Sequence, residues 1–261
     1  MLKAILIGIN YEGTSSKLNG CVNDAMNMLR FLQSETDNNL EYRLLTDAVS
    51  DSEASKLTFA KPTKKHIIEA MTWLRENETS DSCMFVHYSG HGGSVRDRDG
   101  DEKDGKDETI YALDGHITDD ELRKYLVQGL PNKCRLTALF DSCHSGTVLD
   151  LRYVYNVSKN KTHTRYTIDM DRTYPISKAK VVLLSGCRDS GFSADSWADG
   201  QAQGAMTHSF LKTWKRCKRK GQRITYQQLF SGLLKFISNY KQKPQLSSGS
   251  MIDLTKKFRL V

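Results

Sequence analysis

The chain has 261 residues, of which 38% are hydrophobic and 26% charged, so it can build a sizeable core and global disorder is excluded. No apolar run approaches the ~20 residues of a membrane-spanning helix, and the N-terminal apolar stretch is too short for a signal peptide. We therefore expect a soluble, cytoplasmic protein with no membrane partner. The net charge of +7 is concentrated at 212–223, without interleaved aromatic residues or zinc-finger spacing, which favours a solvated helix end over a nucleic-acid surface.

Strand and helix patterns alternate through the first half of the chain. In chain order, we predict a strand at 3–10, a helix at 23–33 and a strand at 41–45. A helix capped by Thr63, a strand that runs into His87 and a polar loop at 93–107 follow. Next come a strand at 109–113, a helix that opens with a capping box at Thr118, and a strand at 135–141.

The second half opens with a stretch, 155–177, that is rich in Lys, Arg, Thr and Asn and predicts a long mobile loop. A strand at 180–185 follows, then helices at 204–219 and 225–240, and a terminal strand at 257–261. Alternating strands and helices predict an α/β fold with a mostly parallel sheet flanked by helices on both faces.

Six cysteines are spread along the chain without a Cys-x-x-Cys pair, which predicts reduced thiols rather than a disulfide framework. Cys83 and Cys134 begin predicted strands, and we expect them to be buried and inert.

Two motifs end apolar strands in small residues and a reactive side chain: Ser89-Gly90-His91-Gly92-Gly93 and Asp141-Ser142-Cys143-His144-Ser145-Gly146. In a parallel sheet both motifs reach the same edge. His91 precedes Cys143 by 52 positions (143 − 91), near the separation of about 50 seen in caspase-type dyads. The pattern predicts a cysteine peptidase with His91 and Cys143 as its catalytic dyad.

The chemistry of such a dyad explains the residue types. An imidazole beside a thiol favours the thiolate and can then protonate the leaving amine. The main-chain N–H groups of Gly92 and Cys143 are candidates for an oxyanion hole. His87 and His144 are weaker candidates for the base, since His87 alternates toward a sheet face and His144 adjoins the nucleophile in sequence.

These motifs closely resemble those of the metacaspases, the caspase-like peptidases of clan CD. The resemblance extends over nearly the whole chain, in type I order, through 18–25, 99–102, 117–121, 184–187, 193–195 and 204–207. It implies a caspase-hemoglobinase fold in a single peptidase domain, commonly monomeric, with a large-subunit-like part at 1–155, a cleavable loop at 156–179 and a small-subunit-like part at 180–261. We expect no counterpart here of the prodomain that many type I members carry.

Asp141 lies two residues before the nucleophile, on the same sheet face, which favours a cationic side chain at the substrate's P1 position. The resemblance places Asp24 beside it and completes the S1 pocket with Cys21 and Ser89. We therefore expect protein or peptide substrates cleaved after Arg or Lys. The alternative roles are an N-terminal helix acid for Asp24 and an N-cap for Asp141.

The segment 96–108 holds seven carboxylates against four basic residues, and clustered oxygen ligands suit Ca²⁺. The spacing does not fit an EF-hand. By resemblance, the calcium ligands are Asp107, Asp119, Asp120 and Asp150. Asp119 and Asp120 have an alternative role as acids at a helix N-terminus.

The cationic loop, with Arg152, Lys159, Lys161, Arg165, Arg172 and Lys178, is a candidate site of self-cleavage. The sequence thus predicts a calcium-dependent cysteine endopeptidase specific for Arg or Lys. The rivals are a catalytically silent interaction protein on the same fold, a clan CD peptidase with another P1 preference, and a nucleic-acid binder, which salt-dependent DNA retention without peptidase activity would favour.

Overall fold

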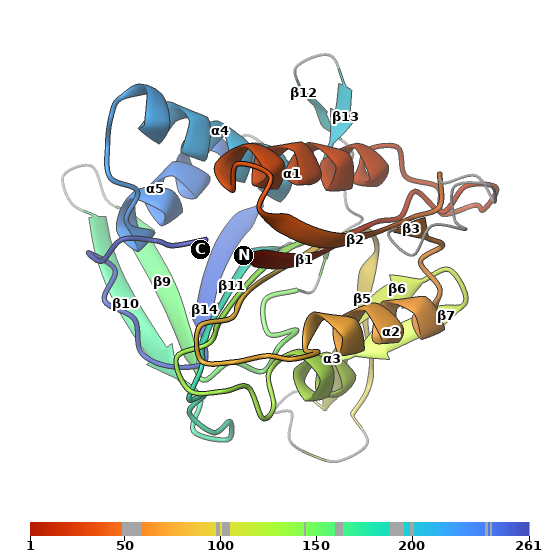
Figure 1. The fold of residues 1–261 in the computed structure, drawn as a ribbon, viewed down its shortest axis with the longest axis horizontal. Helices are drawn as coiled ribbons and strands as arrows, with labels where there is room; N and C mark the ends of the chain where they lie inside the picture. The colour runs from red at the N-terminus through yellow and green to blue at the C-terminus, as the bar shows by residue number, and fades with distance from the viewer. Residues whose placement is uncertain are drawn as a thin grey trace.

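One nine-stranded sheet runs through the computed structural model of the chain, which describes residues 1–48, 59–97, 100, 105–143, 145–159, 164–187, 196–198, 201–237, 240 and 242–260 (Figure 1). In spatial order its strands are β10 (Thr164–Met170), β9 (Tyr153–Lys159), β14 (Lys243–Ser248), β11 (Lys180–Cys187), β8 (Arg135–Asp141), β4 (Cys83–Ser89), β1 (Leu2–Gly8), β2 (Leu40–Thr46) and β3 (Phe59–Ala60).

The centre of this sheet is parallel. Strands β11, β8, β4, β1, β2 and β3 pair in parallel, whereas β14, β9 and β10 add an antiparallel edge. Every residue of β4 is buried, as expected for a parallel strand covered on both faces. The predicted α/β class with a mostly parallel sheet is confirmed.

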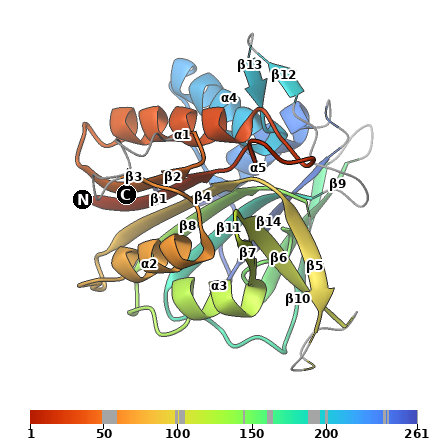
Figure 2. The ribbon, with the colours of Figure 1, turned by 90° about the vertical axis from the view of Figure 1, so that its right-hand side faces the viewer.

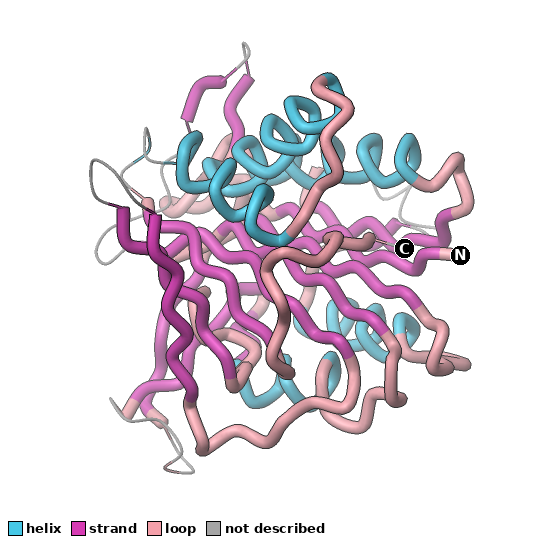
Figure 3. Tube along the Cα trace, turned by 90° about the vertical axis from the view of Figure 1, so that its left-hand side faces the viewer, coloured by secondary structure: helices cyan, strands magenta, loops and turns pink. Residues whose placement is uncertain are grey.

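Helices cover both faces of the sheet. On one face lie α1 (Cys21–Glu35), α4 (Ala205–Arg219) and α5 (Tyr226–Ile237); on the other lie α2 (Lys64–Leu74) and α3 (Asp119–Leu126) (Figures 2 and 3). Each face has its own apolar cluster: Met28 and Phe210 belong to the first, Ile67 and Leu122 to the second. A three-stranded sheet of β5 (Gly92–Arg96), β6 (Lys106–Ala112) and β7 (Gly115–Thr118) adjoins α3. No helix in the described ranges is long and apolar enough to cross a membrane.

The predicted helix starts follow their capping signals. Thr63 caps α2 by accepting from the His66 N–H. Thr118 and Glu121 form a reciprocal capping box at α3. Thr225 and Gln228 do the same at α5, with N–H to oxygen distances of 3.1 Å in both directions.

The structure corrects two loop predictions. The expected loop at 155–177 contains most of β9 and all of β10, which pair as an antiparallel hairpin at the sheet edge and bury Tyr155. The expected polar loop at 93–107 contains most of β5 and the start of β6, while 98–99 and 101–104 lie outside the described residues. In both segments, cross-strand pairing forms strands that the polar composition did not indicate.

The C-terminal end also differs from expectation. Residues 257–260 form no strand; Lys257 makes an isolated antiparallel bridge to Thr225. The missed strand, β14, precedes this segment and pairs with both β11 and β9.

Candidate active site

The ends of β4 and β8 bring the two predicted catalytic loops together. These strands pair in parallel with Ser89 opposite Asp141, and His91 and Cys143 each follow two residues later. A Cβ atom built on Gly92 would overlap the carbonyl oxygen of Cys143, so the two loops are in direct contact and only glycine allows this approach. The predicted proximity of the two loops at one sheet edge is therefore observed.

Three tyrosines fix the backbone of His91. The Tyr88 hydroxyl donates to the His91 carbonyl at 2.6 Å, and the Tyr111 N–H donates to the same oxygen at 3.1 Å. The Tyr11 hydroxyl accepts from the His91 N–H at 2.9 Å, and its ring lies 4.6 Å from the imidazole. Burial raises the pKa of Tyr11 and of Tyr88 above their usual range, so both hydroxyls stay protonated.

The imidazole of His91 is oriented by a carbonyl group. Its Nε2 atom lies 2.6 Å from the carbonyl oxygen of Ser16, in the loop between β1 and α1. A carbonyl oxygen only accepts, so Nε2 carries the proton of this hydrogen bond. In the neutral ring Nδ1 is then the basic nitrogen, available to exchange a proton with a thiol.

Cys143 is a buried residue, 8% exposed, on the turn after β8. Side chains on the turn and on β14 hold that turn: Ser145 Oγ donates to the Ser142 carbonyl at 2.9 Å, and Gln245 Nε2 donates to the Gly146 carbonyl at 2.8 Å. His144 lies outside the described residues. Which residues act in catalysis, including the N–H groups of Gly92 and Cys143, stays a prediction.

Other thiols differ from Cys143 in their setting. Cys83 and Cys134 are buried, as predicted, and neither lies at the carboxyl ends of the strands. Burial raises the pKa of Cys134 to about 11, which keeps this thiol protonated and inert. Cys21, Cys83, Cys134, Cys143 and Cys217 are free thiols.

The two aspartates predicted to line the S1 pocket converge on the start of α4. Asp24 accepts from the Gly204 N–H at 2.9 Å, and Asp141 accepts from the Thr207 N–H at 2.7 Å. A Cβ on Gly204 would clash with oxygens of both carboxylates. Asp24 is 0% and Asp141 3% exposed, so two buried carboxylates meet at the positive end of a helix dipole.

Ser89 and Cys21 belong to the same group of residues. Ser89 Oγ donates to Asp24 Oδ2 at 2.7 Å. Cys21 lies one turn before Asp24 on α1, and both are buried. The structure therefore brings together all four residues predicted for the S1 pocket, from α1, β4 and β8.

His87 packs behind this acidic pair. Its Nε2 atom lies 3.0 Å from Thr207 Oγ1, and burial lowers the pKa of the imidazole to about 3. The ring is neutral at ordinary pH and holds the first turn of α4. Thr207 therefore links His87 through its hydroxyl and Asp141 through its N–H, and the role of His87 as a weaker candidate for the base stays a prediction.

A second acidic cluster lies beside α3. Asp107, Asp119 and Asp120 each offer one oxygen within 4.8 Å of the others. Asp107 comes from β6, and Asp119 and Asp120 from the first turn of α3. Asp119 Oδ2 accepts from the Glu108 N–H and Oδ1 from the Asp120 N–H, at 2.6 and 2.9 Å. These are the hard oxygen ligands that Ca²⁺ prefers.

The electrostatics of this cluster fit a cation. The pKa of Asp119 is raised to about 9, first by burial and then by the negative charge of Asp150. Asp150, 2% exposed, has a left-handed backbone with φ of 47°. Carboxylates crowded in a buried position repel one another, and a divalent cation would reverse that effect. The four predicted ligands therefore lie in one region, three of them close enough to share an ion.

Several contributing groups were not predicted. Ser16 acts through its main-chain carbonyl, which carries no sequence signal. Tyr11 and Tyr88 act as buried hydroxyls, which cannot be told from ordinary core residues in a sequence. Gly204 and Thr207 lie in a motif that supported the resemblance, Gly204-Ala205-Met206-Thr207, but their contact with the acidic pair appears only in three dimensions.

Known proteins match most of this chain in sequence. The profile of the metacaspase peptidase C14 domain matches residues 2–152. The chain is 36% identical over 300 aligned residues to metacaspase-1 of Candida glabrata, covering 98% of this chain and 74% of that protein. It is 37% identical to metacaspase-1 of Mycosarcoma maydis, with 97% and 71% covered.

Two solved structures share the fold. A crystal structure of a Geobacter sulfurreducens protein superposes with a TM-score of 0.66 at 24% identity, covering 98% of this chain and 97% of that one. The structure of pro-sf-caspase-1 superposes with a TM-score of 0.52 at 13% identity, with 99% and 93% covered. The central sheet and its flanking helices are those of a caspase-like fold.

Proposed function

Because this chain belongs to the metacaspases, a family of cysteine peptidases, we propose that it is a calcium-dependent endopeptidase that cleaves after Arg or Lys through Cys143 and His91. One observation supports this more than any other. The loops that carry Cys143 and His91 touch through Gly92 at the sheet edge where Asp24 and Asp141 converge. A nucleophile, a base and two buried negative charges thus share one region.

In the proposed reaction, Nδ1 of His91 takes the thiol proton of Cys143. The thiolate attacks the scissile carbonyl carbon, and the N–H groups of Gly92 and Cys143 stabilise the oxyanion, each worth roughly 10²–10³ in rate. The imidazolium protonates the leaving amine as the C–N bond breaks, leaving an acyl-enzyme thioester. His91 then deprotonates a water molecule that attacks the thioester and regenerates the thiol. The Ser16 carbonyl accepts from Nε2 and so leaves Nδ1 as the nitrogen for this exchange.

The preference for Arg or Lys rests on Asp24 and Asp141. Both are almost fully buried, so a cationic P1 side chain would meet them in a low-dielectric setting where charge attraction is strong. An acidic P1 side chain would be repelled there. The N–H groups of Gly204 and Thr207 hold both carboxylates in place before substrate arrives.

Calcium dependence rests on the cluster beside α3. Asp107, Asp119, Asp120 and Asp150 would hold the ion, which supplies positive charge to a region of crowded carboxylates. Asp107 lies on β6, whose partner strand β5 begins at Gly92. The residues that bind the ion are therefore joined by two paired strands to the loop after His91.

Self-cleavage, a monomeric state and a cytoplasmic location complete the proposal. The basic residues of the predicted cationic loop differ in exposure and contacts. Arg152 donates to the Tyr174 carbonyl at 2.7 Å, whereas Arg172 is exposed on the bend after β10. Exposed bends are preferred sites of nicking. Intact mass before and after calcium addition tests this part; a mass that never changes argues against it.

The test of the whole proposal is turnover of fluorogenic peptides ending in Arg, Lys or Asp, with Ca²⁺ or excess chelator. We expect cleavage of the Arg and Lys peptides only with Ca²⁺, and none by the Cys143→Ala variant. Equal activity in chelator would refute the calcium requirement, and cleavage after Asp would refute the P1 assignment. Absence of all turnover would favour the catalytically silent alternative.

A further inference from the structure

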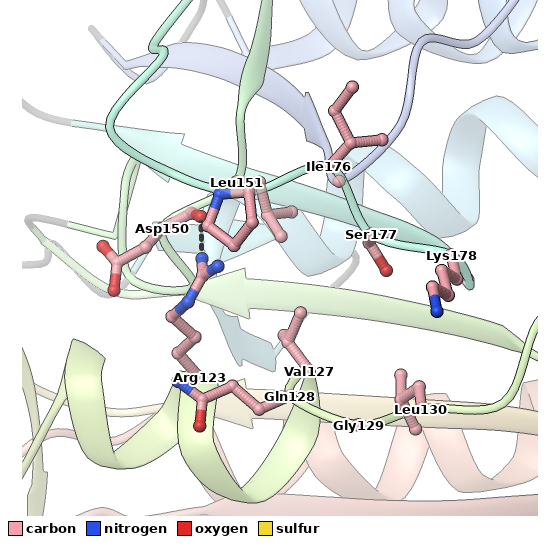
Figure 4. A pocket seen from close by; sticks show the side chains of 12 residues that line it. Arg123, Val127, Gln128, Gly129, Leu130, Asp150, Leu151, Ile176, Ser177 and Lys178 are labelled. Carbon is pink, nitrogen blue, oxygen red and sulfur yellow. Dashed lines mark hydrogen bonds between the residues drawn. The ribbon is translucent and has the colours of Figure 1, made fainter.

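A cavity of about 350 Å³ lies at the C-terminal end of α3, away from the catalytic loops (Figure 4). Its walls come from four separated parts of the chain: Arg123 with residues 127–130, Asp150 with Leu151, residues 175–178, and Gly249. Apart from Asp150, a proposed calcium ligand, it contains none of the residues assigned above to the peptidase.

Apolar side chains form most of the wall. Val127, Leu130 and Leu151 are buried, whereas Ile176 is 57% exposed on the opposite side. Figure 4 shows Ile176 and Lys178 on the upper side of the cavity and Val127 and Leu130 on the lower side. An occupant would therefore contact hydrocarbon over most of its surface.

One wall carries a buried cation. Arg123 is only 8% exposed, and its Nη1 atom donates to the main-chain carbonyl of Asp150. The ring of Tyr174 lies 5.2 Å from the guanidinium carbon. Arg123 makes no ion pair with a carboxylate in the described part of the chain, and Figure 4 shows the Asp150 carboxylate directed away from the guanidinium.

A guanidinium offers five N–H donors. Among the described residues, the Asp150 carbonyl accepts one hydrogen bond from Arg123 Nη1. Burying a charge is costly unless it is paired and hydrogen-bonded, so Arg123 lacks the anion that such a position calls for. Its remaining donors have the fork geometry that suits a two-oxygen anion.

From this geometry we propose that the cavity binds a carboxylate attached to an apolar body. The carboxylate pairs with Arg123, and the apolar part lies against Val127, Leu130 and Leu151. A single buried guanidinium matches a single negative charge, and the apolar walls provide few donors for a phosphate dianion. Exposed Lys178 at the rim adds attraction for the incoming anion. Asp150 is also a proposed calcium ligand, but here only its main-chain carbonyl contacts Arg123, so the proposal does not depend on the proposed peptidase activity.

Two sources share this chemistry, a free aromatic or aliphatic acid and the carboxyl terminus of a peptide. The probes are 4-phenylbutyrate and N-acetylphenylalanine, each compared with its uncharged amide by calorimetry and by ligand-detected NMR on the full chain. We expect saturable binding of an acid and at least about tenfold weaker binding of its amide, because a charge-assisted pair is lost. The acid that binds more tightly identifies the source.

Arg123→Met should abolish the difference between acid and amide, while Lys124→Met removes an equal charge from an exposed neighbour on α3 and should change nothing. Because Arg123 is buried, a second variant guards against misfolding: Ile176→Trp fills the mouth from an exposed position and should block both acids with Arg123 intact. Acids and amides that bind equally, binding that survives in Ile176→Trp, or no saturable binding of either acid would overturn the proposal.

Discussion

Replacing Asp141 with Asn separates the charge of the proposed S1 pocket from its shape. Asp141 is 3% exposed, and its Oδ2 accepts from the Thr207 N–H at 2.7 Å. The Asn side-chain oxygen can still accept that hydrogen bond, so α4 keeps its place. What disappears is one negative charge beside a cationic P1 group, a charge-assisted contact worth about 1.5–3 kcal/mol. That loss corresponds to a decrease of about 10- to 150-fold in kcat/KM.

The assay compares two peptides that differ only at P1, one with Arg and one with citrulline, its uncharged isostere. We expect Asp141→Asn to lower kcat/KM for the Arg peptide and to leave the citrulline peptide within about twofold. Asp169→Asn, an exposed carboxylate on β10, is the matched control and should change neither. The double variant Asp24→Asn, Asp141→Asn should lose less transition-state stabilisation than the two single variants added together, because both carboxylates interact with the same P1 cation.

The result that would refute this reasoning is an equal loss for both peptides, which would assign Asp141 a purely structural role at α4. Unchanged turnover of the Arg peptide would remove it from the pocket altogether. A thermal unfolding curve of the variant, matched to the parent chain, shows that the comparison is made on folded protein.

Further outcomes follow from the same structure. Burial lowers the pKa of His87 from 6.5 to about 3. As pH falls between those values, the imidazole is protonated in the unfolded chain but not in the folded one. The free energy of unfolding therefore decreases by up to about 1.4 kcal/mol per pH unit over this interval. His87→Gln should flatten that part of a plot of Tm against pH, and an unchanged slope contradicts it. Iodoacetamide should modify Cys143 while sparing Cys134, whose pKa is about 11; peptide mapping that finds equal labelling opposes this. Asp119→Asn should weaken Ca²⁺ binding by at least about tenfold in calorimetry, whereas exposed Asp114→Asn should not.

The sequence predicted best those parts of the molecule whose signals are local. The strand at 135–141 has the observed bounds because it is a continuous apolar run that ends in a turn. Thr118 and Thr225 predicted the starts of α3 and α5 because a capping box depends on only four consecutive residues. The two reactive residues stood out for the same reason, since each closes such a strand.

The antiparallel edge was missed because its strands depend on partners. In β9, Tyr153 and Tyr155 are buried while Asn156 is exposed, and exposed Ile168 and Met170 in β10 resemble loop residues. Strand β14 is short and has few strong strand formers. Its pairing with β11 is set by tertiary structure rather than by its own residues.

The active region shows the same limit. Proximity of the two loops follows from parallel strand order, but the orienting carbonyl of Ser16 and the meeting of Asp24 with Gly204, 180 positions apart, depend on packing between distant segments. Main-chain groups carry no residue-type signal, so no reading of side chains would have found them.

The position of the β9–β10 hairpin determines what a nick between its strands would do. The cut would divide the polypeptide into two pieces, yet β8 of the first piece pairs with β11 of the second, and β9 of the first with β14 of the second. The two pieces therefore share one sheet, in which β9 of the first lies between β10 and β14 of the second. A processed molecule should migrate as two bands under denaturing conditions and as one species in a native gel.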